Sequence, residues 1–254
     1  MSDFSTIHVL RLANVDYVTL NRPEVRNAFN EQLIAEMTEW AQRAADDASL
    51  RGVVISGAGA SFCAGADVAW MAKMAGYSQE ENLRDARAAA AMFSVIDTLS
   101  VPVIAQIHGA ALGGGAGIAA VADIAVAADD TTFGFTEVKL GLIPAVIAPY
   151  VLAKIGQSAA RELFITGRRF DAAHARDIGL VHAVVPAADL IDRVNTYLIE
   201  IAANGPEAMS AAKALLRRIA NQPIADTVPI TAKAIAERRV SDEAQKMMKT
   251  FLKK

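Results

Sequence analysis

A glycine-rich segment near the middle of the chain would offer backbone donors to a ligand. Residues 108–117 read HGAALGGGAG and follow an apolar run that is typical of a strand. If these glycines open a helix, its first N–H groups have no partner within the helix, and the positive end of its dipole lies beside them. The segment therefore predicts a site for an anion or a developing oxyanion at residues 113–115.

Two other interpretations of these glycines remain open. One is close packing of a helix on small residues. The other is a dinucleotide site, because residues 115–120 satisfy the pattern G-x-G-x-x-A directly after a strand. A ribose partner should follow the next strand, whereas Asp123 precedes it, which counts against a dinucleotide.

A second segment, residues 61–70, would bring further backbone donors to the same edge of a sheet. It reads SFCAGADVAW and follows a predicted strand at residues 52–56. The carboxyl edge of parallel strands is where α/β proteins usually bind ligands. Small side chains at Ala64, Gly65 and Ala66 would let a ligand reach the backbone N–H groups. The alternative is a tight turn between a strand and a helix.

A third segment supplies a candidate acid–base group. Residues 132–144 read TFGFTEVKLGLIP and place Glu137 among apolar residues, just before a turn. A carboxyl group in such surroundings tends towards a raised pKa, which suits it to proton transfer. The alternative is an exposed Glu137 paired with Lys139.

Alternating strands and helices would position these segments. Apolar runs predict strands at residues 7–12, 16–20, 52–56, 103–107, 124–127 and 181–185, with helices between most of them. Asn30, Ser78 and Asp171 stand where helix N-caps are expected. This order predicts an α/β fold with a mostly parallel sheet. Beyond Pro186 only helical periodicity continues, so we expect a core domain at 1–195 and a helical region at 196–254.

Composition limits the class of protein. Hydrophobic residues make up 53% of the 254 residues and charged residues 21%, with a formal net charge of −3. This balance predicts a globular chain and supplies no general basic field for nucleic acid or an anionic membrane. The apolar stretch at 103–128 suggests a membrane span, but Asp123 and the glycines favour a buried strand, helix and strand. A lone cysteine, Cys63, and a polar N-terminus lead us to expect a cytoplasmic protein without a metal site.

Taken together and in order, these segments resemble the enoyl-CoA hydratase/isomerase family, the crotonase superfamily. The resemblance also covers residues 20–28 (LNRPEVRNA), 122–124 (ADI) and 167–185. It implies a crotonase-like spiral of ββα units with a C-terminal helical trimerisation region. It further implies an acyl-CoA thioester substrate, no separate cofactor because coenzyme A is part of the substrate, and a homo-trimer or a hexamer built as a dimer of trimers.

The same resemblance assigns roles to individual residues. The N–H groups of Ala66 and Gly114 would form an oxyanion hole for the thioester oxygen, and Glu137 would be the catalytic acid–base. Losing one such donor typically costs about 10²–10³ in rate. The expected contacts with coenzyme A come from Arg26, Ala28, Ala64, Asp67, Val68, Phe251 and Lys254.

The chain departs from the family at Gly117. Typical hydratases carry a second glutamate there, on the same helical face as Gly114. Three functions therefore stay open: hydration of a branched 2-enoyl-CoA, double-bond isomerisation by Glu137 as the single base, and binding of coenzyme A without catalysis. Hydration is favoured because residues 70–82 and 137–151 look like bacterial methylglutaconyl-CoA and isohexenylglutaconyl-CoA hydratases. A second carboxylate on such a substrate would be bound by Lys73, Arg84 or Lys139.

Overall fold

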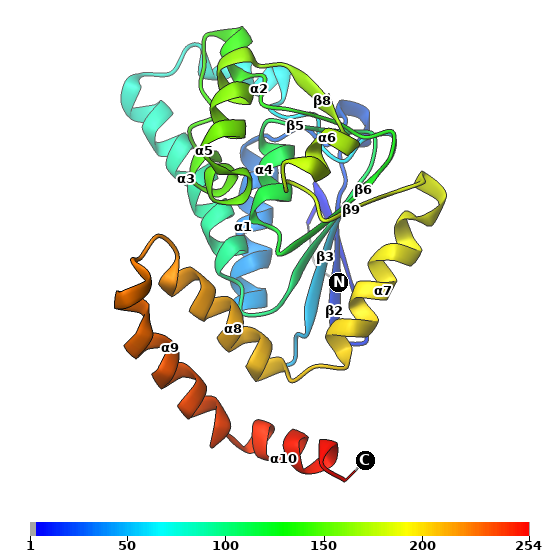
Figure 1. The fold of residues 1–254 in the computed structure, drawn as a ribbon. Helices are drawn as coiled ribbons and strands as arrows, with labels where there is room; N and C mark the ends of the chain where they lie inside the picture. The colour runs from blue at the N-terminus through cyan, green and yellow to red at the C-terminus, as the bar shows by residue number, and fades with distance from the viewer. Residues whose placement is uncertain (1–3, 254) are drawn as a thin grey trace.

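The computed structural model describes residues 4–253 and shows two β-sheets surrounded by helices (Figure 1). The larger sheet contains β1 (Ile7–Leu12), β2 (Val15–Leu20), β3 (Gly52–Gly57), β4 (Val103–Ile107), β6 (Ile124–Ala128) and β9 (Ala183–Val185), paired in this order. β1 and β2 form an antiparallel hairpin, and the other neighbours in this sheet run parallel. The predicted, mostly parallel α/β sheet is thereby confirmed.

A smaller sheet lies beside the carboxyl ends of these strands. It contains β5 (Ala110–Leu112), β7 (Thr132–Gly134) and β8 (Arg169–Asp171), in that order. Along the chain, β4 of the large sheet is followed by β5 of the small one, and β6 by β7. These two turns of the spiral thus each contribute one strand to each sheet before a helix follows. The sequence did not predict β5, because three residues are too few to show a period.

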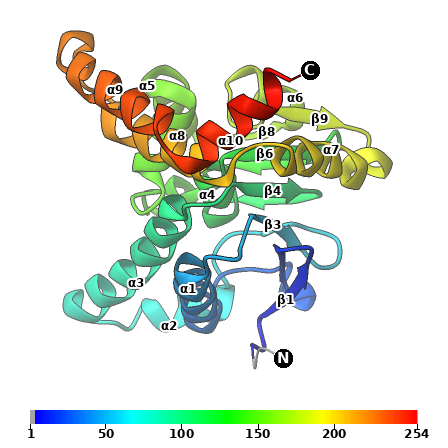
Figure 2. The same cartoon turned by 90° about the horizontal axis from the view of Figure 1, so that it is seen from below.

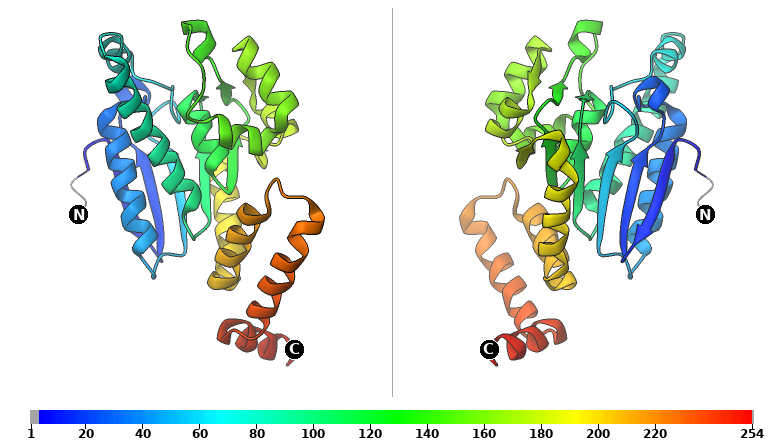
Figure 3. Two further views of the ribbon diagram at one scale, coloured as in Figure 1. Left: turned by 90° about the vertical axis from the view of Figure 1, so that its left-hand side faces the viewer. Right: turned by 90° about the vertical axis from the view of Figure 1, so that its right-hand side faces the viewer.

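Helices cover both faces of the large sheet. The helices of residues 4–253 are α1 (Glu31–Asp46), α2 (Val68–Met74), α3 (Gln79–Thr98), α4 (Gly114–Val121), α5 (Ala148–Thr166), α6 (Ala172–Asp177), α7 (Leu190–Ala202), α8 (Pro206–Ile219), α9 (Ile224–Arg239) and α10 (Asp242–Phe251), with 3-10 turns η1 (Pro23–Val25), η2 (Glu137–Leu140) and η3 (Ala187–Asp189). α1 and α3 lie side by side, and α7 lies on the other side of the sheet (Figure 3).

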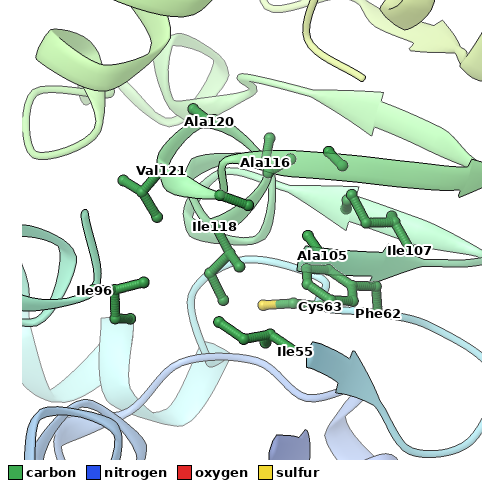
Figure 4. Packing of buried hydrophobic residues seen from close by; sticks show 14 of the residues in the cluster. Ile55, Phe62, Cys63, Ile96, Ala105, Ile107, Ala116, Ile118, Ala120 and Val121 are labelled. Atoms are coloured by element: carbon green, nitrogen blue, oxygen red, sulfur yellow. The ribbon is translucent and has the colours of Figure 1, made fainter. Parts of the chain in front are cut away.

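Alternate residues of the central strands supply two apolar cores. On β3, Ile55 packs in the main core with α3 and α4, whereas Val54 packs on the opposite face against α7. Figure 4 shows Ile55 and Ala105 facing Ile118 of α4. Successive side chains of a strand point to opposite faces, so a strand covered on both faces is apolar throughout. This explains the long apolar stretch at 103–128, which the structure divides into strand, helix and strand as predicted.

The membrane alternative for this stretch is wrong. Within residues 4–253, no helix combines the length and the apolar character needed to cross a bilayer.

The predicted N-caps are confirmed: the side chains of Asn30, Ser78 and Asp171 accept the N–H groups of Leu33, Glu81 and His174. α5 consists of two helical parts that meet at Gly156, whose φ of 72° and ψ of 169° are not helical, in agreement with two helices at 148–156 and 158–166. α2 was not predicted.

The last three helices project from the core (Figures 1 and 2). None of them buries a residue within the chain. Lys213 of α8 is tied to the core, since its ammonium donates to Asp123 at 2.6 Å and to the carbonyl of Val101 at 3.1 Å. The predicted boundary at residue 195 falls within α7, whose Leu190 and Val194 pack on the sheet. The part of the chain that leaves the core begins at α8.

Glu36 on α1 holds the N-terminal segment against the core. Its carboxylate accepts the N–H of Thr6 at 2.8 Å and the N–H of Ser5 at 3.1 Å, together with the hydroxyls of both residues. Burial raises the pKa of Glu36, but these hydrogen bonds outweigh it and hold the pKa at about 2. A carboxyl whose pKa is lowered on folding stabilises the protein above its unfolded pKa, and this contribution is lost as the pH falls towards the folded value.

We expect Glu36→Gln to remove this pH-dependent contribution, on the order of 2 kcal/mol at neutral pH. Denaturant unfolding at pH values between 2 and 7 measures it, and the variant should lose less stability on acidification than the parent protein. Glu39→Gln, at an exposed position of the same helix, is the matched control. Equal acid sensitivity of the Glu36 variant and the parent would contradict this role.

Candidate active site

Two backbone N–H groups are left free at the carboxyl edge of the sheet. Across the described residues 4–253, the N–H groups of Ala66 and Gly114 donate to neither a backbone nor a side-chain acceptor. Gly114 is the first residue of α4, so its N–H has no partner within the helix. Its neighbour Gly113 has a φ of 50°, which turns the chain from β5 into the helix.

The free N–H of Ala66 results from a short pairing with Phe29. The Phe29 N–H donates to the carbonyl of Gly65 at 2.7 Å, and the Asp67 N–H donates to the carbonyl of Phe29 at 2.9 Å. Successive N–H groups of an extended chain point to opposite sides, so the N–H of Ala66 points away from Phe29. Asp67 holds the next turn by accepting the N–H of Ala69 at 2.7 Å and pairing with Arg22 at 2.7 Å.

The glycines at the start of α4 allow close packing, and the N–H of one of them stays open to a ligand. A Cβ on Gly115 would lie 2.5 Å from the carbonyl oxygen of Cys63, and one on Gly114 would lie 2.8 Å from the ring of Phe29. The α4 backbone therefore contacts these two segments directly. The packing interpretation of this motif is confirmed, and it is the reason that the donors of Ala66 and Gly114 reach one cavity.

Glu137 faces the glycine loop at the start of η2. Its Oε1 would lie 3.0 Å from a Cβ placed on Gly113, so carboxylate and loop are in contact range. Its Oε2 is buried and has no hydrogen-bond partner in the described part of the chain. Burial raises the pKa of Glu137, while the N–H of its own backbone lowers it less. Lys139 is exposed and forms no ion pair with it, so the surface-pair interpretation is wrong.

A cavity of about 650 Å³ joins these groups. Its size is that of a site for a small molecule. α1, α2, α3 and the segment after η2 supply its mostly apolar wall. The lining residues are Phe29, Ile34, Ala66, Trp70, Met74, Asn82, Asp85, Ala86, Ala89, Met92, Phe93, Gly114, Glu137 and 141–147. Two free donors and one unpaired carboxylate on one cavity can stabilise an oxyanion and move a proton beside it.

The position of the missing second glutamate is filled by apolar side chains. A Cβ on Gly117 would lie 2.4 Å from Cγ2 of Ile147 and 3.0 Å from Cε1 of Phe93. Both of these residues line the cavity. The sequence shows that a carboxylate is absent at 117, and the structure adds that the space for one is gone.

The residues expected to contact coenzyme A fall into two groups. Arg26, Ala64, Asp67 and Val68 lie near one another beside the start of α2, where the N–H of Ala64 donates to the carbonyl of Arg26 at 3.0 Å. Ala28 is buried next to them, and its carbonyl accepts a guanidinium N–H of Arg22 at 2.5 Å.

Phe251 is separated from this group. It is exposed at the end of α10, which lies at the opposite end of the molecule from α2 (Figures 1 and 3). Lys254 lies outside the described residues. One chain therefore does not bring Phe251 to its own cavity.

The spiral core and this cavity define the class of protein, an enzyme of the crotonase fold. The family model "Enoyl-CoA hydratase/isomerase" matches residues 11–254. This chain belongs to the enoyl-CoA hydratase/isomerase family.

Individual relatives agree along nearly the whole chain. A solved enoyl-CoA hydratase from Shewanella pealeana has a TM-score of 0.95 at 34% identity, covering 99% of this chain and 94% of that one. A Legionella pneumophila structure assigned to the enoyl-CoA hydratase/isomerase (crotonase) group has a TM-score of 0.93 at 42% identity, covering 99% and 97%. "Probable enoyl-CoA hydratase echA8" of Mycobacterium bovis is 32% identical over 254 residues, which is 99% of this chain and 96% of the relative.

Glu137→Gln should lower turnover of an enoyl-CoA by about 10²–10⁴ while coenzyme A still raises the melting temperature. If Glu137 is the catalytic base, its carboxylate form is the active one, and burial raises its pKa. The rate should therefore fall on acidification at a higher pH than an ordinary glutamate would give. A pH profile of kcat/KM measures this limb. Unchanged turnover in the variant would remove Glu137 from the chemistry.

Proposed function

We propose that this enzyme adds water to a branched 2-enoyl-CoA, or removes it in the reverse direction, with Glu137 as the only catalytic carboxylate. The observation that carries the proposal is the convergence of the free N–H groups of Ala66 and Gly114 with the carboxyl group of Glu137 on one cavity. Backbone donors suit the thioester oxygen because they are in place before charge develops on it. The hydratase names of the relatives support the same reaction.

One carboxylate is enough if the proton moves in two steps. The oxygen of water attacks the β-carbon while Glu137 accepts a proton from that water. The electron pair of the double bond moves towards the thioester, giving an enolate whose oxygen is held by the N–H groups of Ala66 and Gly114. Glu137 then returns the proton to the α-carbon, so that water has been added and the carboxylate is regenerated.

Isomerisation is the second candidate, and the packing at Gly117 favours it. Because Ile147 and Phe93 fill that position, α4 itself offers no second carboxylate to hold a water molecule, and the other acid in the lining, Asp85, lies on α3. A double-bond shift needs only one base, which removes a proton at one carbon and returns it at another. The same enolate and the same two donors would serve this reaction.

We also propose that the site is completed in a trimer or a dimer of trimers. Arg26, Ala64, Asp67 and Val68 would hold the pantetheine and phosphate parts of coenzyme A beside the start of α2, with Ala28 behind them. The adenine would be contacted by Phe251 and Lys254 of another copy, since α10 lies far from the cavity of its own chain. Exposed apolar side chains on the last helices support assembly: Leu216, Ile224, Val228, Ile235, Val240, Phe251 and Leu252.

The reaction is tested by following the ultraviolet absorbance of the conjugated enoyl thioester. With a branched 2-enoyl-CoA we expect loss of absorbance and incorporation of solvent oxygen at the β-carbon. A gain of absorbance with a 3-enoyl-CoA, and no loss with any 2-enoyl-CoA, would instead establish the isomerase. The Glu137→Gln protein is the control in both assays. No change with either substrate, despite a coenzyme A-induced rise in melting temperature, would leave a non-catalytic binding protein.

The assembly is tested by sedimentation at micromolar concentration, where we expect a mass of three or six chains. Val240→Asp places a charge in the exposed apolar surface and should shift the population towards monomer without loss of helical circular dichroism. Lys233→Ala, at another position on α9, is the matched control. A monomeric parent protein would refute the trimer and the placement of adenine beside Phe251.

A further inference from the structure

The last helix of the described chain is held in place by one carboxylate. α10 buries no residue within this part of the chain, so apolar packing does little to fix its direction relative to α8 and α9. Glu243, in its first turn, has a side chain that is only 13% exposed. The carboxylate lies where the start of α8, the end of α9 and the start of α10 meet (Figure 3).

Glu243 caps the start of α8, although it lies far along the chain from that helix end. Its Oε1 accepts the N–H of Glu207 at 2.9 Å, and its Oε2 accepts the N–H of Ala208 at 2.9 Å. The N-cap residue of α8 is Gly205, which has no side chain to accept these N–H groups. The carboxylate of Glu243 therefore satisfies two donors that the helix leaves free, and it faces the positive end of the helix dipole.

Gly205 leaves room for that carboxylate. It is buried and has an ordinary φ of −70°, so its backbone conformation does not require glycine. A Cβ at this position would lie 2.7 Å from Oε2 and 3.0 Å from Oε1 of Glu243. An alanine here would therefore displace the carboxylate from the N–H groups that it accepts.

Arg238, at the end of α9, joins the same carboxylate. One guanidinium N–H donates to Oε2 of Glu243 at 2.7 Å, and another donates to the carboxylate of Glu207 at 3.0 Å. The side chains of Arg238 and Glu243 are both mostly buried, so salt and water screen this ion pair less than a pair at the surface. Three helices are thereby tied together by charge-assisted hydrogen bonds to one group.

These ties set the position of Phe251. It lies about two turns after Glu243 on the same helix, which is about 12 Å along the axis. α8 is tied in turn to the core through Lys213 and Asp123. A continuous path of helices and hydrogen bonds therefore runs from the core, through α8 and Glu243, to the exposed ring of Phe251.

We infer that Glu243 is a positioning residue for coenzyme A: its carboxylate fixes α10 in the direction that brings Phe251 to the adenosine part of a coenzyme A held by a neighbouring copy. This inference rests on the proposed function, in which Phe251 of another copy contacts the adenine. Glu243 acts through α10, because its carboxylate is engaged by α8 and α9.

The test compares an enoyl-CoA with the same acyl group on pantetheine, which lacks the adenosine and its phosphates. Glu243→Gln should raise KM for the coenzyme A thioester by about fivefold or more at unchanged kcat, and it should leave both constants for the pantetheine thioester unchanged. Gly205→Ala, which displaces the carboxylate without removing it, should give the same pattern. Asp242→Asn removes an exposed charge from the same helical turn and is the matched control.

A double variant separates positioning from a general loss of structure. Phe251→Ala should raise KM for the coenzyme A thioester in the parent protein but add little in the Glu243→Gln protein, because both changes remove the same contact. Sedimentation should give the mass of the parent protein for every variant. An unchanged KM in the Glu243→Gln protein, an equal loss with both thioesters, additive effects of the two changes, or dissociation of the Glu243→Gln protein would overturn the inference. Absence of turnover by the parent protein would instead refute the proposed function itself.

Discussion

The direct contact between the α4 backbone and the segment before α2 is the constraint on which the rest of the site depends. Gly115 has room for no Cβ because the carbonyl of Cys63 lies there, and Gly114 packs on the ring of Phe29. Phe29 also pairs with Gly65 and Asp67 through the backbone, which directs the N–H of Ala66 to the cavity. Two donors far apart in the chain thus reach one cavity. Backbone donors held this way need no reorganisation when charge develops between them, which is the main physical requirement of enolate chemistry.

The two donors stabilise negative charge, whereas the surroundings of Glu137 disfavour the charged form of its carboxyl group. It lies against the glycine loop with one oxygen buried and unpaired, so the surroundings favour the protonated form more than water does. A base in this state binds a proton more readily, as the proposed two-step transfer requires. The apolar contact of Ile147 and Phe93 at Gly117 leaves this proton transfer to one residue.

The C-terminal helices are the part of the chain on which the proposed assembly rests. α8 to α10 bury no residue within the chain, yet they carry large apolar side chains on their surface. α8 is tied to the core by Lys213 and Asp123, and the following helices extend beyond it. Apolar surface of this extent is normally covered by another protein surface. The proposed trimer would cover it and would bring a second chain to the coenzyme A end of the site.

Local signals in the sequence predicted the mostly parallel sheet and the N-caps at Asn30, Ser78 and Asp171, and they singled out Glu137 and the small-residue segments at 64–66 and 113–115. The family, and with it the donors Ala66 and Gly114, followed from the resemblance of several segments taken together. Short elements such as β5 and α2 were missed, since a few residues carry no readable period. The contact of Ile147 with Gly117 and the distance of α10 from the cavity were decided by tertiary structure alone. These features depend on which segments meet in space, and spacing along the chain does not carry that information.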